Sequence, residues 1–245
     1  MRQNRRSTED MFVPIHDDNP LRHIRMPVVT WGIIAICCLI FFLEASGMEH
    51  RVLASFAIVP MELLRMGVLG GAAMGPNDAL AVPERYTLVS YMFLHGDIMH
   101  LTGNMLFLWV FGDNVEDALG HLRYALFYVF CGIAGGLAHA FMLPTSGIPL
   151  IGASGAIAGV ITAYVLLYPK VLVWVLAFRF FPLRISAAFA LGAWILTQFA
   201  MLAVPYLMPG TNIGPISWWS HIGGIVAGGG LLLAMRYAAP SGERP

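Results

Sequence analysis

The hydrophobic positions of the chain gather into six apolar runs, separated by polar or Pro-containing segments. A helix needs about 20 predominantly apolar residues to cross a bilayer, with a usual range of about 17 to 25. The pattern therefore predicts an all-α, polytopic membrane protein with a bundle of six transmembrane helices. The runs cover residues 27–43, 100–112, 122–143, 148–168, 185–208 and 218–235.

Two apolar stretches leave alternatives open. Residues 171–181 are short and flanked by charge, so we assign them to an interfacial loop, with a seventh span as the alternative. The run 27–43 also fits a signal peptide cleaved near Ala45-Ser46-Gly47. Its late start and the spans that follow it favour an uncleaved helix.

The segments outside the runs differ in length and charge. Residues 44–99 form a long amphiphilic connection, and a connection of this length is usually functional or contains short helices of its own. We expect it to lie partly in the outer membrane interface. Residues 1–26 are polar and basic and predict a tail that lies at most on the membrane surface. The membrane domain then covers 27–236, and a second tail covers 237–245.

The placement of Lys and Arg predicts the orientation. With the N-terminus inside, the inner segments carry 11 of the 14 Lys and Arg residues, and Arg51, Arg65 and Arg85 lie outside. Positive residues favour the cytoplasmic side of a membrane. We therefore expect both termini in the cytoplasm, which agrees with an even number of spans. We expect the protein in the inner (plasma) membrane of a bacterium.

The composition supports a membrane protein and excludes other classes. The chain of 245 residues is 58% hydrophobic and 11% charged, with a mean hydropathy of +0.72, whereas soluble domains are about 25% charged. The net charge is zero, which removes any bulk electrostatic argument for binding nucleic acid. Cys37, Cys38 and Cys131 lie inside apolar runs, so we interpret them as packing residues.

One short motif, Gly152-Ala153-Ser154-Gly155, lies between a Pro-containing turn and an apolar run. The turn stops the preceding helix, so Ser154 is expected at a helix N-terminus with free N–H groups beside it. A serine in that position can act as a nucleophile next to an oxyanion site. Taken alone, however, the motif is more often a helix-packing pattern.

Two histidines lie at the same depth as the serine in the predicted topology. Ser154, His100 and His221 lie 16, 13 and 15 residues from the first charged residue on the inner side. At about 1.5 Å per residue, these spacings place all three roughly 6 to 10 Å below the outer surface of a core about 30 Å thick. Polar groups at this depth are costly unless they face one another or a water-filled cavity.

These residue types fit acyl-transfer chemistry. His221 can take the hydroxyl proton of Ser154 as a general base. His100 and Asn104 are four residues apart, so they share one helix face and can donate to a developing oxyanion together with the Ser154 N–H. A single His or Asn in a span is more often a structural group. Only their combination with the serine favours catalysis.

Glycines predict that the helices carrying the serine and the histidine pack closely. Gly155 and Gly159 have the spacing Gly-xxx-Gly, and so do Gly224 and Gly228. This spacing lets two helices approach closely. The approach is expected to bring the hydroxyl and the imidazole within hydrogen-bond reach.

Other polar residues fit structural roles. Asp113, Glu116 and Asp117 fall on the inner side, roughly a membrane's width from the serine, so they cannot complete a triad. His95 and His139 are interpreted as structural groups. The chain has no His-Glu-x-x-His motif and no pair of aspartates in opposed spans. We therefore expect neither a metal nor another cofactor.

Together and in this order, the motifs resemble those of the rhomboid intramembrane serine proteases. The resemblance covers about residues 84–236. The residues that carry it are Arg85, His100-x-x-x-Asn104, Gly112-x-x-x-Glu116-x-x-x-Gly120, Gly152-Ala153-Ser154-Gly155 and His221-Ile222-Gly223-Gly224-x-x-x-Gly228.

The resemblance implies a dyad of Ser154 and His221 without a third acid. It implies an oxyanion pocket formed by His100, Asn104 and the backbone of the serine, and cleavage of transmembrane protein substrates near their outer ends. It also implies that the helix 185–204 and the loop 205–217 form a mobile gate and cap.

The chain departs from the family pattern at three positions. Glu84 occupies the place of a family Trp before Arg85. Ala158 replaces an aromatic residue that stacks on the catalytic histidine in some members, so other groups must orient the imidazole. Ser220, where Ala is common, can add a hydrogen bond.

Two other functions compete with proteolysis. One is a catalytically inactive rhomboid-like protein that binds or escorts transmembrane clients. The other is a small transporter, which only the glycines and the Pro-broken helices suggest.

Overall fold

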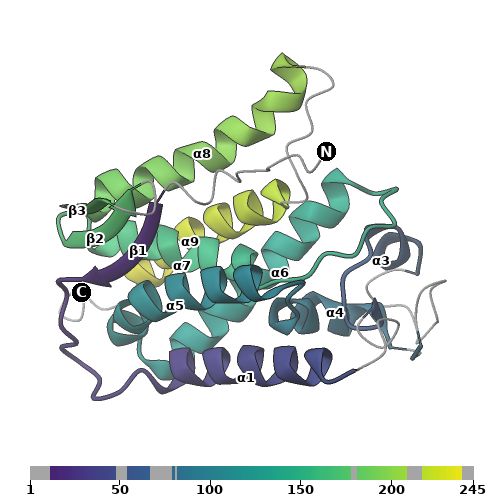
Figure 1. The fold of residues 1–245 in the computed structure, drawn as a ribbon, viewed down its shortest axis with the longest axis horizontal. Helices are drawn as coiled ribbons and strands as arrows, with labels where there is room; N and C mark the ends of the chain where they lie inside the picture. Colours follow the sequence, from purple (N-terminus) through teal and green to yellow (C-terminus); the bar gives the residue numbers. More distant parts are fainter. Residues whose placement is uncertain are drawn as a thin grey trace.

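Six helices of 14 to 22 residues form the framework of the part of the chain that the structure describes (Figure 1). The computed structural model describes residues 12–47, 54–66, 79–80, 82–177, 181–208 and 217–238. Each helix overlaps one of the six predicted runs, which confirms the prediction of a mostly helical membrane protein, whereas six membrane crossings remain a prediction. The helices are α1 (Val28–Ala45), α5 (Ile98–Leu119), α6 (His121–Met142), α7 (Ser154–Leu167), α8 (Ala187–Leu207) and α9 (Trp218–Ala238).

Four of these helices are long and apolar enough to cross a membrane. The other two differ from them for separate reasons: α5 carries three carboxylates in its last two turns, and α7 has only 14 residues. At about 1.5 Å per residue, α7 is about 21 Å long, which is less than a hydrocarbon core of about 30 Å. The four spans are Val28–Ala45, His121–Met142, Ala187–Val204 and Trp218–Met235.

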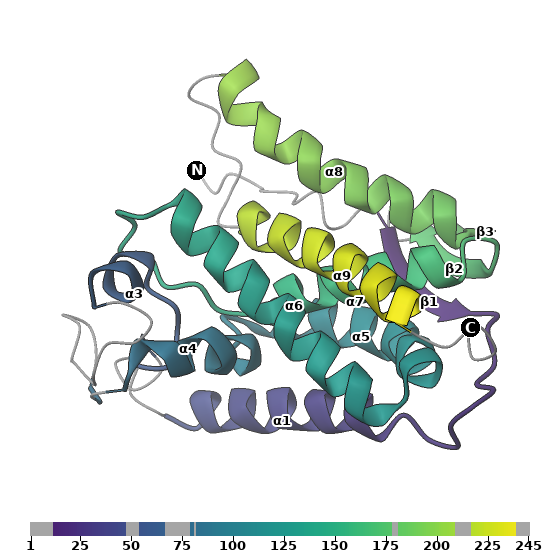
Figure 2. The same cartoon turned by 180° about the vertical axis from the view of Figure 1, so that it is seen from behind.

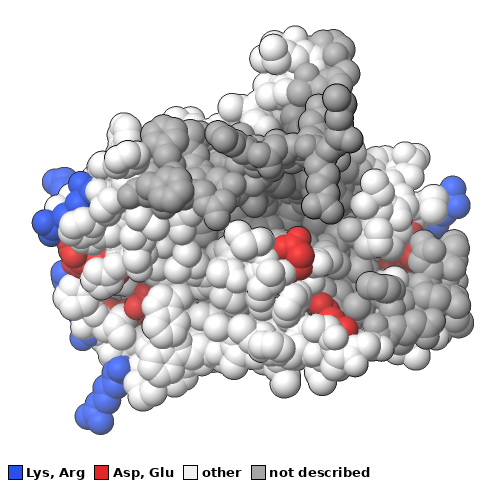
Figure 3. Space-filling view, in the orientation of Figure 1, with Lys and Arg blue, Asp and Glu red and all other residues white. Residues whose placement is uncertain are grey.

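The surface of the bundle suits lipid. Figure 3 shows Lys and Arg toward the two ends of one face and none on the described surface between them. Large apolar side chains such as Leu39, Phe130 and Leu196 are exposed on α1, α6 and α8. Exposed apolar surface of this extent favours a membrane over water as the surrounding medium.

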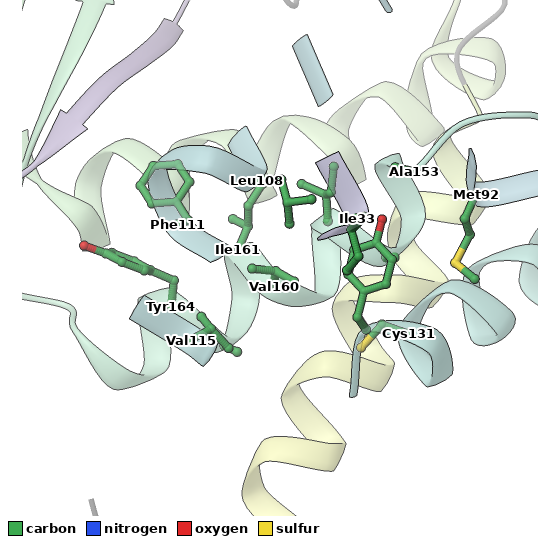
Figure 4. Packing of buried hydrophobic residues seen from close by; sticks show 14 of the residues in the cluster. Ile33, Met92, Leu108, Phe111, Val115, Cys131, Ala153, Val160, Ile161 and Tyr164 are labelled. Atoms are coloured by element: carbon green, nitrogen blue, oxygen red, sulfur yellow. The ribbon is translucent and has the colours of Figure 1, made fainter. Parts of the chain in front are cut away.

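α7 is the central helix of the bundle. Every residue from Gly155 to Tyr164 is buried. The rings of Phe111 on α5 and Tyr164 on α7 meet at 4.9 Å, and Figure 4 shows Leu108, Val160 and Ile161 in the same layer. Figures 1 and 2 place α1 along one edge of the bundle and α8 along the other.

The helices alternate in direction. α5, α7 and α9 begin at one end, which we call the Ser154 end, and α1, α6 and α8 begin at the other, which we call the Glu116 end (Figures 1 and 2). Contacts between helix termini agree with this arrangement, because the start of α1 bonds to the last turns of α5. The first turns of α5, α7 and α9 therefore share one end of the bundle.

Glycines bring the backbones of α7 and α9 into contact. A Cβ atom added at Gly228 would lie 2.5 Å from the carbonyl oxygen of Gly159, and one added at Gly224 would overlap the carbonyl oxygen of Gly155. Any side chain at these positions would push the two helices apart. The helices thus pack as their Gly-xxx-Gly spacing predicts.

The long connection before α5 contains short helices, as expected. They are α3 (Pro60–Met66), α4 (Glu84–Ser90) and the 3-10 helix η2 (Tyr91–Phe93). Ile58 and Leu150 exchange backbone hydrogen bonds of 3.1 and 2.7 Å, so the connection holds the loop that leads into α7. Its partial immersion in the membrane interface remains a prediction.

A three-stranded antiparallel sheet at the Glu116 end is the main addition to the predicted fold. Its strands are β1 (Phe12–Asp17), β2 (Leu172–Ala177) and β3 (Phe181–Ser186), in the order β1-β2-β3. The stretch 171–181, assigned from the sequence to an interfacial loop with a seventh span as the alternative, instead contains β2 and the first residue of β3. Its side chains alternate: Val173 and Val175 are buried, whereas Trp174 is exposed.

The N-terminal segment is more ordered than the predicted tail. Residues 12–17 form β1 and pair with β2, an ordered element that the prediction of a polar tail over residues 1–26 did not include. Asp17 is buried and accepts hydrogen bonds from Tyr164 Oη (2.5 Å) and Asn114 Nδ2 (3.1 Å), and burial raises the pKa of its carboxyl group. Residues 1–11, 209–216 of the expected cap, and 239–245 lie outside the described residues.

Two buried carboxylates near the end of α5 accept hydrogen bonds from the backbone before and within the first turn of α1. Glu116 accepts the N–H groups of Val29 (3.0 Å) and Thr30 (2.8 Å) and the hydroxyl of Thr30 (2.7 Å). Asp117 accepts the N–H groups of residues 22–24 at 2.7 to 3.0 Å. These groups include N–H donors of the first turn of α1, which have no partner within the helix.

We expect Glu116→Ala to lower the free energy of unfolding by about 2 to 4 kcal/mol, because it leaves buried N–H donors of α1 without an acceptor. Asp18→Ala is the control, since it removes only the exposed ion pair with Arg184 and should cost less than about 1 kcal/mol. Thermal unfolding in detergent measures both. Equal effects of the two substitutions would contradict the role assigned to Glu116.

Candidate active site

The structure brings Ser154 and His221 together. Ser154 is the first residue of α7, and His221 lies in the first turn of α9. Their side chains meet with 2.9 Å between Oγ and Nε2. His221 is buried and Ser154 is half-buried. The distance is that of a hydrogen bond, which is the contact that a general base needs with the hydroxyl it deprotonates.

The loop before α7 presents the serine at a helix N-terminus. The first backbone hydrogen bond of the helix runs from Ile157 N to Ala153 O, so the N–H groups of the three preceding residues have no partner within the helix. Gly152 has φ +115° and donates its N–H to Tyr91 O at 2.9 Å. This backbone conformation favours glycine. The loop therefore needs glycine to turn the chain into α7.

His100 and Asn104 face this loop from α5. A Cβ atom added at Gly152 would lie 2.6 Å from His100 Nε2 and 3.7 Å from Asn104 Nδ2. Asn104 is 8% exposed, and its buried Nδ2 has no hydrogen-bond partner among the described residues. A buried donor without a partner is costly unless something else binds to it. An oxygen atom bound beside Ser154 would satisfy it.

The start of α5 fixes the position of His100. Asp97 is the N-cap residue, and its Oδ1 accepts the N–H of His100 at 2.8 Å. The rings of His95 and His100 meet edge to face at 5.2 Å. Asp97 was absent from the sequence predictions, although an Asp three residues before a His at the start of an apolar run is an N-cap signal.

Gln198 is a second residue of the site that the sequence analysis missed. Its Oε1 lies 2.8 Å from His221 Nδ1, and both residues are buried. The rings of Trp194 and Trp218 lie 6.0 and 5.9 Å from the imidazole. Residue 158 is Ala and cannot stack on the imidazole of His221. The contacts with Gln198, Trp194 and Trp218 surround the imidazole instead. The available signal was a glutamine within an apolar span, where an unpaired amide is costly.

The remaining histidines named from the sequence lie in structural contacts. His139 Nδ1 is 2.8 Å from Ser217 Oγ, so it connects the end of α6 to the start of α9. His95 Nδ1 is 3.3 Å from the carbonyl oxygen of Phe93. Ser220 is buried against Gly135 and Gly155. Its hydroxyl has no hydrogen-bond partner among the described residues, so the expected bond is not observed there.

The acidic residues of α5 lie at the other end of the bundle. Glu116 and Asp117 bind the start of the chain, and Asp113 accepts hydrogen bonds from Asn114. Neither a carboxylate contact with His221 nor a cluster of three metal-ligating side chains occurs among the described residues. The arrangement therefore offers a serine, a histidine, an amide acceptor and nearby donors.

Comparison with known proteins assigns this arrangement to a family. The model of the Rhomboid domain matches residues 82–238, which include every residue of the site. Rhomboid-like protein 11, chloroplastic, of Arabidopsis thaliana is 36% identical over 84 residues, covering 34% of this chain and 30% of that protein.

Two further relatives differ in what their names state. The rhomboid protease GluP of Bacillus subtilis is 33% identical over 138 residues, covering 56% of this chain and 24% of its own. Inactive rhomboid protein 1 of Drosophila melanogaster is 30% identical over 102 residues, covering 41% of this chain and 7% of its own. This chain thus spans less than a third of the length of each of these three relatives.

We expect Gly152→Ala to disrupt the site, because a methyl group would meet the His100 imidazole in a backbone conformation that already disfavours alanine. The expected loss is about 1 to 3 kcal/mol in the free energy of unfolding. Gly147→Ala is the matched control, since its methyl group would have no neighbour closer than 3.9 Å. Thermal unfolding of the two variants makes the comparison. A Gly152→Ala protein as stable as the control would contradict this account of the loop.

Proposed function

The chain belongs to the rhomboid family, and we propose that it is an intramembrane serine endopeptidase that cleaves transmembrane segments of membrane proteins near one membrane face. The distance of 2.9 Å between Ser154 Oγ and His221 Nε2 is the observation that carries the proposal. A serine hydroxyl is a weak nucleophile until an adjacent base takes its proton. Similarity to the rhomboid protease GluP supports the same function.

In the proposed reaction, His221 Nε2 takes the proton of Ser154 as Oγ attacks the carbonyl carbon of the substrate. The protonated imidazole then gives this proton to the leaving amine, which leaves an acyl-enzyme ester on the serine. Water attacks the ester, with the same nitrogen first accepting and then returning a proton. The cycle ends with the hydroxyl and the neutral imidazole restored.

The oxyanion of the tetrahedral intermediate requires donors close to Ser154. The N–H of Ser154 is free of intrahelical bonds, and Asn104 Nδ2 is a buried donor without a partner. His100 lies beside both and supplies a third donor when Nε2 carries a proton. Donors fixed before the reaction lower the barrier, because they need no reorganisation when charge develops.

We propose that the substrates are transmembrane proteins with helix-breaking residues near the cut bond. An intact helix keeps its carbonyl groups in hydrogen bonds, so a segment must unwind before Ser154 can attack it. We further propose that both termini are cytoplasmic and that the Ser154 end faces outward, because of the distribution of Lys and Arg. By resemblance, α8 and the loop after it, partly outside the described residues, serve as the gate and cap.

The alternative is a catalytically inactive relative that binds or escorts transmembrane clients. Similarity to inactive rhomboid protein 1 of Drosophila melanogaster keeps this candidate open. Binding does not require a hydroxyl and an imidazole at hydrogen-bond distance, so the geometry of this chain favours proteolysis. Capture of uncleaved clients by the wild type, with no product after long incubation, would support the alternative.

We expect Ser154→Ala and His221→Ala each to abolish cleavage of a fluorogenic transmembrane substrate in liposomes. A serine-directed fluorophosphonate probe should label the wild type but not Ser154→Ala. The control is Leu233→Ala, which changes an exposed side chain far along α9 and should leave both readouts unchanged. Cleavage at the wild-type rate by either dyad variant would overturn the proposal.

We expect Asn104→Ala to lower kcat by about 100-fold with little change in KM, because the lost donor acts mainly in the transition state. Thr102→Ala, an exposed substitution on the same helix, is the control and should retain wild-type kinetics. Steady-state cleavage in liposomes gives both parameters. A rise in KM at unchanged kcat would show that Asn104 binds the substrate rather than the oxyanion.

A further inference from the structure

A buried glutamine of α8 contacts the nitrogen of His221 that faces away from the serine. Gln198 Oε1 lies 2.8 Å from Nδ1, while Nε2 of the same imidazole faces Ser154 Oγ at 2.9 Å. Gln198 is 3% exposed and His221 is 4% exposed. Both nitrogens of the imidazole therefore have a defined partner in a site shielded from solvent.

The other contacts of Gln198 determine which end of its amide faces the imidazole. Gln198 Nε2 lies 2.9 Å from the carbonyl oxygen of Trp194, which can only accept a hydrogen bond. The nitrogen of the amide must therefore point to that carbonyl. Oε1, which can only accept, is the atom left for His221. The orientation of the amide is thus fixed by its own helix.

This orientation selects one tautomer of the neutral imidazole. An acceptor at Nδ1 requires that Nδ1 carry the proton, which leaves a lone pair on Nε2 facing the hydroxyl of Ser154. The opposite tautomer would set two lone pairs against each other at 2.8 Å and would present an N–H to the hydroxyl. Only the first tautomer can take the serine proton. A base that deprotonates Ser154 requires this state.

The position of Gln198 on α8 adds a second feature. Residues 187, 190, 191 and 198 of α8 are buried, whereas none of the described side chains from 199 to 208 is. Figures 1 and 2 show the C-terminal half of α8 diverging from α9. Gln198 is therefore the last buried side chain that the structure describes on α8 before the helix diverges from α9.

We propose that Gln198 is a positioning residue of the dyad: its amide oxygen holds His221 in the tautomer and orientation that can deprotonate Ser154, and it does so only while α8 lies against α9. The inference rests on the proposed function for its kinetic consequence. Its structural content, the state of the imidazole, can be measured without catalysis. Trp194 and Trp218 confine the imidazole on its sides but offer it no acceptor in the described contacts.

Two substitutions at Gln198 separate the acceptor from the volume of the side chain. Gln198→Met keeps a similar length without the amide oxygen, and we expect kcat and the rate of fluorophosphonate labelling to fall about 10- to 100-fold, because a buried Nδ1–H loses its partner. Gln198→Glu keeps an acceptor and should restore most of both rates at alkaline pH. Leu233→Ala again serves as the unchanged control.

The pH profile distinguishes positioning from mere structural support. A carboxylate at Gln198→Glu would stabilise the protonated imidazole, which cannot accept the serine proton. The acidic limb of the rate profile should therefore move to higher pH than in the wild type. A loss of packing alone would lower the melting temperature without moving this limb. Wild-type rates in Gln198→Met, or superimposable profiles of Gln198→Glu and the wild type, would overturn the inference.

Nitrogen NMR of protein labelled in the histidine imidazole reads the tautomer directly. We expect Nδ1 protonated and Nε2 unprotonated at His221 in the wild type, and a mixture of tautomers in Gln198→Met, with His221→Ala to assign the signals. A wild type with this tautomer but without cleavage or Ser154 labelling would reject the proposed function and leave the inference standing. An unchanged spectrum in Gln198→Met would reject the inference alone.

Discussion

The backbone contact between α7 and α9 is the constraint on which the site depends. The dyad joins the first turns of two helices 67 residues apart in the chain, so its geometry is set by how closely those helices approach. Gly155 and Gly159 on α7 face Gly224 and Gly228 on α9 with no room for a side chain. In lipid, where apolar surfaces gain little by leaving the solvent, such packing is a main source of helix association. The same contact therefore holds the bundle together and sets the distance between hydroxyl and imidazole.

A second constraint acts on the polar groups, because each must find a partner away from water. At the Glu116 end, the carboxylates of Glu116 and Asp117 accept hydrogen bonds from N–H groups before and within the first turn of α1. At the Ser154 end, Asn104 Nδ2 is a buried donor without a partner among the described residues. It therefore keeps the capacity to bind an oxygen atom of a substrate beside Ser154.

Much of this organisation could be predicted from the sequence because it follows from local patterns. Apolar runs gave the six helices, the Gly-xxx-Gly spacing gave the packing of α7 on α9, and common depth gave the pairing of Ser154 with His221. Two features needed tertiary information. β1 pairs Phe12 and Asp17 with residues about 160 positions later, and a six-residue strand has too little pattern to predict such a partner. Gln198 contacts His221 because of the way α8 packs against α9. The spacing of residues within one helix does not determine this packing.

The location of Gln198 on α8 has a consequence for timing. A transmembrane segment that enters by displacing α8 would also remove the acceptor from Nδ1, so the histidine would lose its selected tautomer at the moment of entry. Chemistry would then wait for α8 to return over the bound segment. Segments that dissociate before this return would leave uncut, and those that remain longer would be cleaved. Selectivity would then depend on residence time as well as on the sequence around the cut bond, and a fast-exchanging membrane protein would be spared.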